Sequence, residues 1–386
     1  MRHIFLYLLD LFCRFLYPAN ENYFDTAASM PICPEALYAL IETSMLVGNS
    51  NADNKTGLLL RSREEEARQV IADALNVPSD SIVFTSGATE SNNIIIQGVV
   101  RAYVRQTGRR AHIVSSEIEH PSVLSVIQHL DVDYTLVRAG KDGKIQAQDI
   151  ADALRENTVL VSIHALHHEI GVVQDIHSIY RICQSRSIPL HCDASQAFLR
   201  DVDLCGDFIT ISGHKIGAPK GIGAFFIRDR SLCEPLMYGG GREPLRPGTV
   251  PTALIVAFAA AVRQKALLAD VSCQKMQRLR SALSDISSVQ VITPQESRHI
   301  LLLKIPGVFQ KDLYEHLDDF VLARGSACGS SLDQEASPVM RSIGISSDEE
   351  VASFLRLSVH AHLGDRSIFA LRKKLCNLQD EWHFDL

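Results

Sequence analysis

A lysine held in a glycine-rich turn is the residue of this chain whose type and surroundings best suit covalent chemistry. The turn reads Ser212-Gly213-His214-Lys215 and continues through small residues to Gly223. Short apolar runs, Phe208 to Ile211 and Ala224 to Ile227, predict a strand on each side of the turn. A lysine confined between small residues loses solvation, so the pKa of its amine can fall, as a Schiff-base lysine requires.

A second polar stretch suits a phosphate group. It reads Thr85-Ser86-Gly87-Ala88-Thr89-Glu90-Ser91-Asn92-Asn93 and follows a predicted strand at Ile82 to Phe84. Its small residues and hydroxyls open a predicted helix, where free backbone N–H groups favour an anion. The stretch contains neither a P-loop nor a GxGxxG pattern. Taken alone, we interpret it as an ordinary capped helix start.

The elements around these stretches alternate between strand and helix. Seven short apolar, β-branched runs predict strands at Ile82-Phe84, His112-Val114, Tyr134-Val137, Val159-Ile163, Pro189-His191, Phe208-Ile211 and Ala224-Ile227. Longer amphipathic runs between them predict helices at Glu90-Arg105, Pro121-His129, Ala147-Arg155 and Ile176-Ser185. This alternation indicates an α/β fold with a mostly parallel seven-stranded sheet. Ligands of such sheets bind beyond the carboxyl ends of the strands, where the polar stretches lie.

The length of 386 residues predicts two domains. We expect a large domain over residues 23–252 and a smaller α/β domain over residues 253–386, which begins with a long helical stretch from Ala253 to about Ser284. Residues 1–22 form an apolar extension, interrupted by Asp10 and Arg14 and too short to span a bilayer. We favour a helix docked on the protein or at a dimer contact over a membrane-surface anchor.

Composition excludes some functions. The net charge of −7 gives no basic footprint for nucleic acid, and the short basic clusters mix with acids, as on solvated helix faces. These clusters are Arg61-Arg63, Arg109-Arg110 and Arg372-Lys374. The nine cysteines are odd in number and contain no CxxC pair, which argues against a disulfide framework and a zinc site. We therefore expect a cytoplasmic protein without a metal centre.

Five motifs in order give the chain a family resemblance. They are Thr85-Asn93, Ser116-Glu117-Ile118-Glu119-His120, His191-Cys192-Asp193-Ala194-Ser195-Gln196, Ser212-Lys215 and Arg324-Gly325-Ser326-Ala327-Cys328. From about Tyr23 to the C-terminus the chain resembles the NifS/IscS-type cysteine desulfurases. These are pyridoxal 5'-phosphate (PLP) enzymes of the class V aminotransferase group, and the resemblance implies their fold type I architecture.

The resemblance implies roles around the cofactor ring. Lys215 would hold PLP covalently, and Asp193 would pair with the pyridine nitrogen so that the ring stays an electron sink. His120 would stack on the ring and assist acid–base steps. Gln196 and His168 would bind the phenolic oxygen. Outside this context, Asp193 could equally cap a helix and His120 could be an ordinary core or surface histidine.

The same resemblance assigns the phosphate. Its ligands would be the backbone near Gly87 and Ala88 and the side chains of Thr89, Ser212 and His214. A threonine of the partner subunit also reaches the phosphate in this family, and the matching residue here is Thr249, within Arg246-Pro247-Gly248-Thr249. The active site would then require a homodimer.

Two further residues concern the substrate. Arg356 resembles the arginine that binds the substrate α-carboxylate, a task suited to a planar, permanently charged fork. Cys328 lies among small residues, Gly325 to Ser331, which we expect to form a mobile loop. Its thiolate would attack the sulfur of cofactor-bound L-cysteine, leaving alanine and a Cys328 persulfide. An iron–sulfur scaffold or a tRNA-thiolation protein would accept the sulfur.

Three departures from the family pattern leave alternatives open. His167-His168 stands where the family has two asparagines, and Asn54 and Arg242 stand where it usually has histidines. Such changes are compatible with a selenocysteine lyase, with another class V lyase or aminotransferase, or with a degenerate paralogue that acts as a scaffold. The retained Lys215 and Asp193 favour an enzyme.

Overall fold

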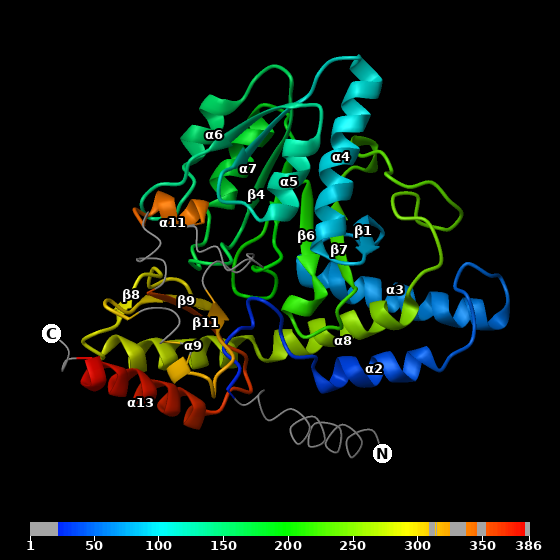
Figure 1. The fold of residues 1–386 in the computed structure, drawn as a ribbon. Helices are drawn as coiled ribbons and strands as arrows, with labels where there is room; N and C mark the ends of the chain where they lie inside the picture. The colour runs from blue at the N-terminus through cyan, green and yellow to red at the C-terminus, as the bar shows by residue number, and fades with distance from the viewer. Residues whose placement is uncertain (1–21, 309–312, 314, 325–336, 346–352, 383–386) are drawn as a thin grey trace.

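The structure is a computed structural model that describes residues 22–308, 313, 315–324, 337–345 and 353–382. The N-terminal extension predicted at residues 1–22 lies almost wholly outside these ranges, and so does Cys328. Figure 1 shows a large sheet with its helices in the upper part of the molecule and a smaller sheet at lower left, beside α9 and α13.

The large sheet has seven strands in the order β1-β7-β6-β5-β4-β2-β3. Their bounds are β1 (Ile82–Thr85), β2 (His112–Ser116), β3 (Asp133–Val137), β4 (Thr158–His164), β5 (Leu190–Asp193), β6 (Phe208–Ser212) and β7 (Gly223–Ile227). Only β7 runs against its neighbours β1 and β6; the other pairs are parallel. The predicted fold class, with its mostly parallel seven-stranded sheet, is confirmed.

Both faces of the large sheet are buried, which explains why its strands are apolar throughout. Side chains alternate along β1: Ile82 and Phe84 join one core cluster, and Val83 joins another on the opposite face. The second cluster includes residues of α4 (Ala88–Thr107) and α5 (Pro121–His129), and the first includes α7 (Ile176–Ser185). With α6 (Ala147–Ala153), these are the four predicted helices.

Two long helices precede the sheet, and the sequence reading did not place them. They are α2 (Pro34–Ser44) and α3 (Lys55–Leu75), and both pack against α8 (Thr252–Leu267). The predicted helical stretch from Ala253 to Ser284 is two helices, because the chain bends by 59° between α8 and α9 (Ala269–Ser284). Among the described residues no single helix has the length and hydropathy to cross a membrane, although this bent pair passes the same test.

The smaller sheet is antiparallel, in the order β10-β11-β9-β8. Its strands are β8 (Gln290–Val291), β9 (Ile300–Lys304), β10 (Ala323–Arg324) and β11 (Phe354–Ser358). Helix α11 (Pro338–Ser342) lies between β10 and β11 in the chain, and α13 (Asp365–Trp382) follows β11. Phe24 is buried in the core beside the small sheet, and Asp25 bridges to Ser358 of β11, so the first described residues pack with the small sheet. The division at residue 252 stays a prediction.

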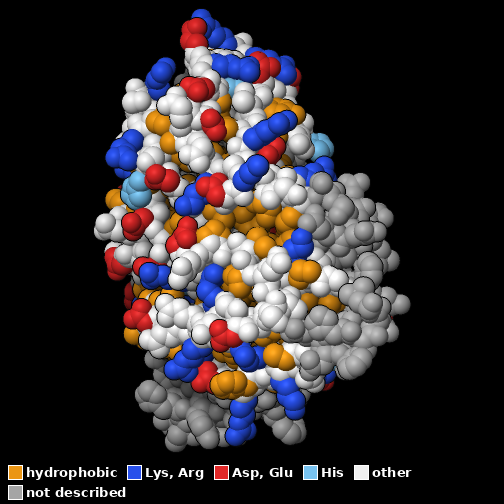
Figure 2. Space-filling model, turned by 90° about the vertical axis from the view of Figure 1, so that its left-hand side faces the viewer, with side chains coloured by type: hydrophobic (Ala, Val, Ile, Leu, Met, Phe, Trp, Pro, Cys, Tyr) orange, Lys and Arg blue, Asp and Glu red, His pale blue; other side chains and the backbone are white. Residues whose placement is uncertain are grey.

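The surface bears out the mixed charge of the basic clusters. Arg110 pairs with Asp131 and Asp133, and the other clusters pair likewise: Arg61 with Asp53, Arg63 with Glu42, Arg109 with Glu156, Arg372 with Asp285 and Lys374 with Asp319. On the face shown in Figure 2, basic side chains lie among acidic ones. Arg61–Arg63 and Arg372–Lys374 lie partly exposed on α3 and α13, as predicted, whereas Arg109 and Arg110 lie in the exposed loop between α4 and β2.

Candidate active site

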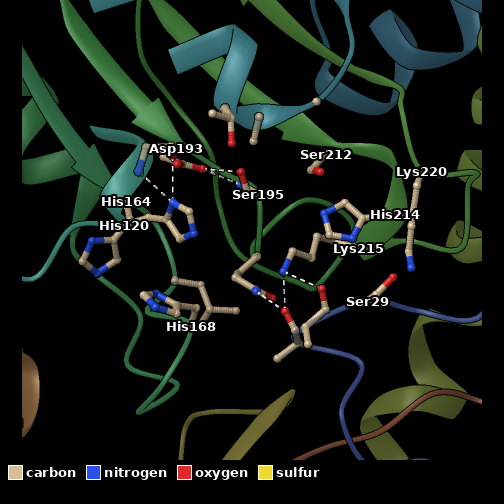
Figure 3. A pocket seen from close by; sticks show the side chains of 18 of the residues that line it. Ser29, His120, His164, His168, Asp193, Ser195, Ser212, His214, Lys215 and Lys220 are labelled. Atoms are coloured by element: carbon tan, nitrogen blue, oxygen red, sulfur yellow. Dashed lines mark hydrogen bonds between the residues drawn. The ribbon is translucent and has the colours of Figure 1, made fainter. Parts of the chain in front are cut away.

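A cavity of about 590 Å³ lies beyond the carboxyl ends of the parallel strands of the large sheet. Strands β1, β2, β4, β5 and β6 all point toward this edge, so the residues that follow them meet there. The predicted site residues that line it are Gly87, Ala88, Thr89, His120, His168, Asp193, Gln196, Ser212, His214, Lys215 and Arg356. Figure 3 shows Lys215, His214 and Ser212 on one side and His120, His164 and His168 on the other.

One predicted site residue that the structure describes does not line this cavity. Thr249 is exposed in the loop before α8, so its assignment to a partner subunit's site stays a prediction. Cys328 lies outside the described residues, and its role stays a prediction as well.

Lys215 ends a short 3-10 turn, Gly213–Lys215, directly after β6. A side chain at Gly213 would place its Cβ 2.8 Å from the carbonyl oxygen of Ile222, so the turn requires glycine. The amine of Lys215 donates to the carbonyls of Ala27 at 2.5 Å and Ala28 at 3.0 Å. The side chain of Lys215 is therefore held between the end of β6 and the segment that contains Ala27 and Ala28.

Asp193 is the last residue of β5 and is 6% exposed. Its Oδ1 accepts hydrogen bonds from the backbone N–H of Ser195 at 2.9 Å and its hydroxyl at 2.5 Å, and its Oδ2 accepts from Nδ2 of Asn92 at 2.9 Å. Burial alone would raise the pKa of Asp193, but these bonds and nearby His191 hold it below its ordinary value. Asp193 is thus a buried carboxylate that stays ionised.

The start of α4 forms a cradle for an anion. Gly87 caps this helix at φ 156°, a conformation that favours glycine, and nothing lies within 4 Å of where its Cβ would be. The cavity wall adds Ser212, His214 and Lys220 to the free N–H groups of the first turn. Burial lowers the pKa of His214 to about 4, so Lys220 supplies the positive charge.

His120, His164 and His168 line the opposite wall of the cavity, and the buried ring of His167 packs against His164 and His168. The rings of His167 and His168 stack with centroids 4.7 Å apart, and His120 meets His168 edge-on at 5.5 Å. Burial lowers the pKa of both His167 and His168 well below the ordinary value, so both rings are neutral. Within the described part of the chain, no three His, Cys, Asp or Glu side chains are arranged to hold a metal ion.

Arg356 lies on β11 at the floor of the cavity and is 3% exposed. Its guanidinium donates to Asp25 at 2.5 Å and to the carbonyl of His168 at 2.9 Å. Its Nε–H is buried without a hydrogen-bond partner among the described residues. Because Asp25 and the carbonyl of His168 hold the guanidinium in place, its remaining N–H donors are already oriented for a carboxylate that enters the cavity.

The class V aminotransferase family model matches residues 22–368. A cysteine desulfurase IscS from Tolumonas auensis is 35% identical over 382 residues, 93% of each chain. The chain belongs to the cysteine desulfurases of this family. A NifS-like protein of known structure has a TM-score of 0.83 at 26% identity, over 93% of this chain and 99% of that one. The structure of SspA in complex with cysteine has a TM-score of 0.78 at 30% identity, over 89% and 100%.

Two of the departures from the class V pattern lie away from the cavity of this enzyme. Asn54 caps α3, where its side chain accepts from the N–H of Gly57 at 2.8 Å. Arg242 forms an exposed ion pair with Glu65. Only His168 brings a changed side chain into the cavity, so the enzyme departs from its family most directly there.

Sequence reasoning missed several residues of the site of this class V enzyme. Asn92 and Ser195 stand inside stretches already quoted as motifs, and Lys220 stands in the glycine-rich turn that follows Lys215, so their polar side chains were a usable signal. Asp25 had no such signal, because its partner Arg356 is 331 residues away in sequence. The carbonyls that hold Lys215 carry no side-chain signature at all.

Proposed function

We propose that this enzyme uses PLP to remove sulfur from L-cysteine, giving L-alanine and a persulfide on Cys328. The observation that carries the proposal is one cavity that gathers four groups: a lysine amine, an ionised buried carboxylate, a helix N-terminus with a lysine, and an arginine. Each group has a counterpart in PLP or in an amino acid substrate.

The residues present fit PLP by the chemistry of their donors and acceptors. Buried atoms without hydrogen-bond partners among the described residues include Nδ1 of His214 and Oε1 of Gln196. Lys215 would bind the cofactor, Asp193 would accept from its pyridine nitrogen, and the α4 cradle with Ser212 would hold its phosphate. When bound, PLP supplies an electron sink for charge developing at the substrate Cα.

The substrate is proposed to bind by its α-carboxylate. Asp25 and the carbonyl of His168 orient the guanidinium of Arg356, which leaves Nε–H and further N–H donors for a bidentate contact. The amine of Lys215 then takes the Cα proton. As an ammonium group it finds the carbonyls of Ala27 and Ala28 within hydrogen-bonding distance, and these stabilise its charge.

The sulfur transfer balances without a redox partner. The thiolate of Cys328 attacks the substrate sulfur, an S–S bond forms as the C–S bond breaks, and the carbon takes a proton to become alanine. The persulfide would pass to the thiol of an acceptor protein, an iron–sulfur scaffold or a tRNA-thiolation protein. This chemistry requires thiols to stay reduced, as in the cytoplasm, and the seven described cysteines are free.

A homodimer is part of the proposal. The turn between α2 and α3 and the loop before α8 carry large exposed apolar side chains: Met45 is 78%, Val47 86% and Tyr238 82% exposed. Asn51 bonds the carbonyl of Gly248 at 3.4 Å, so the two segments lie side by side. Burying this apolar end against a second copy would bring exposed Thr249 to the interface, as sharing of a phosphate ligand requires.

The test is product formation by the protein reconstituted with PLP. We expect alanine from L-cysteine, and we expect Lys215→Ala to lose both the visible absorbance of the bound cofactor and the activity. Alanine from selenocysteine alone would assign the enzyme as a selenocysteine lyase. A wild-type protein that binds no PLP would overturn the proposal.

A further inference from the structure

We infer that Asn92 and Ser122 hold His120 as the neutral tautomer that carries its proton on Nε2. His120 precedes α5 and caps it: its Nδ1 accepts from the backbone N–H of Ser122 at 3.0 Å and lies 2.8 Å from the Ser122 hydroxyl. The hydroxyl oxygen accepts from Nδ2 of Asn92 at 2.9 Å. The same Nδ2 donates to Oδ2 of Asp193 at 2.9 Å.

These hydrogen bonds form a series from Asp193 through Asn92 and Ser122 to His120. The groups at the two ends of the series fix the donor and the acceptor in every bond. Asp193 is an ionised carboxylate and can only accept, so Asn92 must turn its amide nitrogen toward it. Both amide hydrogens are then used, one on Asp193 and one on the oxygen of Ser122. The hydroxyl hydrogen of Ser122 is left to point at Nδ1 of His120.

At the other end of the series of hydrogen bonds, the backbone N–H of Ser122 can only donate to His120. Nδ1 therefore faces two donors and must present its lone pair, so the ring proton is on Nε2. A proton added to Nδ1 would face the N–H that caps the helix. The geometry opposes the imidazolium form whatever the surrounding charge.

The groups that face the ring act in the same direction on balance. Burial lowers the pKa of His120, the charge of Asp193 and of Glu119 raises it, and Lys215 lowers it, with a net decrease. The remaining neighbour, His168, meets the ring edge-on and is neutral. Charge and hydrogen bonding thus agree on a neutral ring.

The consequence for the reaction rests on the proposed function. A neutral ring with its proton on Nε2 can donate a hydrogen bond into the cavity from that nitrogen, but it has no lone pair there to take a proton. The base at the substrate is then Lys215, and Asn92 and Ser122 are positioning residues. The acid–base role that the family resemblance gives His120 is limited to donation.

The test is ¹⁵N NMR of histidine-labelled holoenzyme, with the His120 signals assigned by their loss in His120→Gln. Between about pH 6 and 9 we expect Nε2 protonated and Nδ1 not. Ser122→Ala removes one donor but keeps the backbone cap, so the tautomer persists and imidazolium forms about fivefold more readily. Asn92→Leu should also favour the imidazolium form of His120, because the Ser122 hydroxyl is then free to accept a hydrogen bond from Nδ1–H.

Ser122→Thr keeps the hydroxyl and should restore the wild-type titration. Ser125→Ala, on the exposed side of the same helix, is the matched control and should change nothing. A wild-type ring protonated on Nδ1, or identical titration in the Ser122→Ala, Ser122→Thr and Ser125→Ala variants, overturns the inference. If Asn92→Leu does not fold, the Ser122 variants decide alone. The NMR spectra report the tautomer of His120 even if the enzyme forms no alanine from L-cysteine. Failure of this inference can therefore be distinguished from failure of the proposed function.

Discussion

At the scale of single residues, Asp25 orients Arg356, the proposed ligand of the substrate carboxylate. The two side chains form a buried ion pair, 2% and 16% exposed at arginine and aspartate. Removing the charge of Asp25 should let the guanidinium rotate while leaving the cofactor end of the cavity intact. A hydrogen bond to a charged group contributes about 1.5–3 kcal/mol, and each 1.4 kcal/mol is tenfold in an equilibrium constant.

We therefore predict that Asp25→Asn raises KM for L-cysteine about tenfold and changes kcat less, as steady-state kinetics would measure. Asp53→Asn is the matched control, because Asp53 forms an exposed ion pair with Arg61 and is not among the residues that line the cavity. An unchanged KM in Asp25→Asn would show that Arg356 does not need this partner.

The residues that sequence alone could predict are those next to strand ends. Lys215 and Asp193 were predictable because each follows an apolar run that forms a buried strand, and such strand ends meet at one edge. Asp25 and Asn92 were not, because their partners lie 331 and 101 residues away and no local pattern encodes that pairing. Cys328 keeps its predicted role without a structural description.

At the scale of elements, the approach of β7 to the start of α4 shapes the anion cradle. A Cβ added at Gly223 would lie 2.7 Å from Cα of Gly87, which is backbone and has no room to yield. We predict that Gly223→Ala lowers the free energy of unfolding by about 1–3 kcal/mol and weakens PLP binding. Urea denaturation and cofactor titration measure the two effects.

Gly240→Ala is the control for this substitution, since its Cβ would meet no atom within 4 Å. Equal stability and equal PLP affinity in Gly223→Ala and the wild type would mean that β7 does not shape the cradle.

The centre of the large sheet should respond to acid through His191. Its ring bridges strands, with Nδ1 2.8 Å from the Ser162 hydroxyl and Nε2 3.0 Å from the Thr210 hydroxyl. Burial lowers its pKa to about 4, whereas the unfolded chain titrates near about 6.5. Below that pH the unfolded state binds more protons than the folded state, so stability falls as pH decreases from about 6.5 to about 4.

We predict that His191→Asn is less stable than the wild type at neutral pH, because it loses these bonds, but loses less further stability on acidification. Thermal unfolding across this pH range measures both slopes. His129→Asn, an exposed histidine on α5, should keep the wild-type slope. If stability depends on pH in His191→Asn as steeply as in the wild type, His191 is not the group responsible for the loss of stability in acid.

The elements themselves were only partly predictable. Strands buried on both faces gave continuous apolar runs, which locate the sheet well. The break between α8 and α9 falls at Leu268, where neither glycine nor proline signals an end. Strand β11 was not anticipated, because its five residues pair with β9 and β10, which are distant in sequence.

At the scale of the whole molecule, the apolar end formed by Met45, Val47 and Tyr238 should hold the proposed dimer together. We predict that Tyr238→Glu shifts the protein toward a monomer and lowers its PLP content, because Thr249 of the second copy no longer completes the phosphate site. Size-exclusion chromatography with light scattering measures the mass. Phe369→Glu, which changes an exposed phenylalanine on α13, should leave the dimer intact. A monomeric wild type that retains PLP contradicts the shared site.

The central claim is that L-cysteine gives up its sulfur to Cys328. The most direct measurement is mass spectrometry of the PLP-loaded enzyme after one turnover, together with alanine released. We predict one added sulfur on the peptide that contains Cys328, alanine in matching amount, and neither product from Cys328→Ala. Cys273→Ala, at a partly buried cysteine near His299, should behave as wild type. Alanine formed by Cys328→Ala at the wild-type rate would contradict the claim.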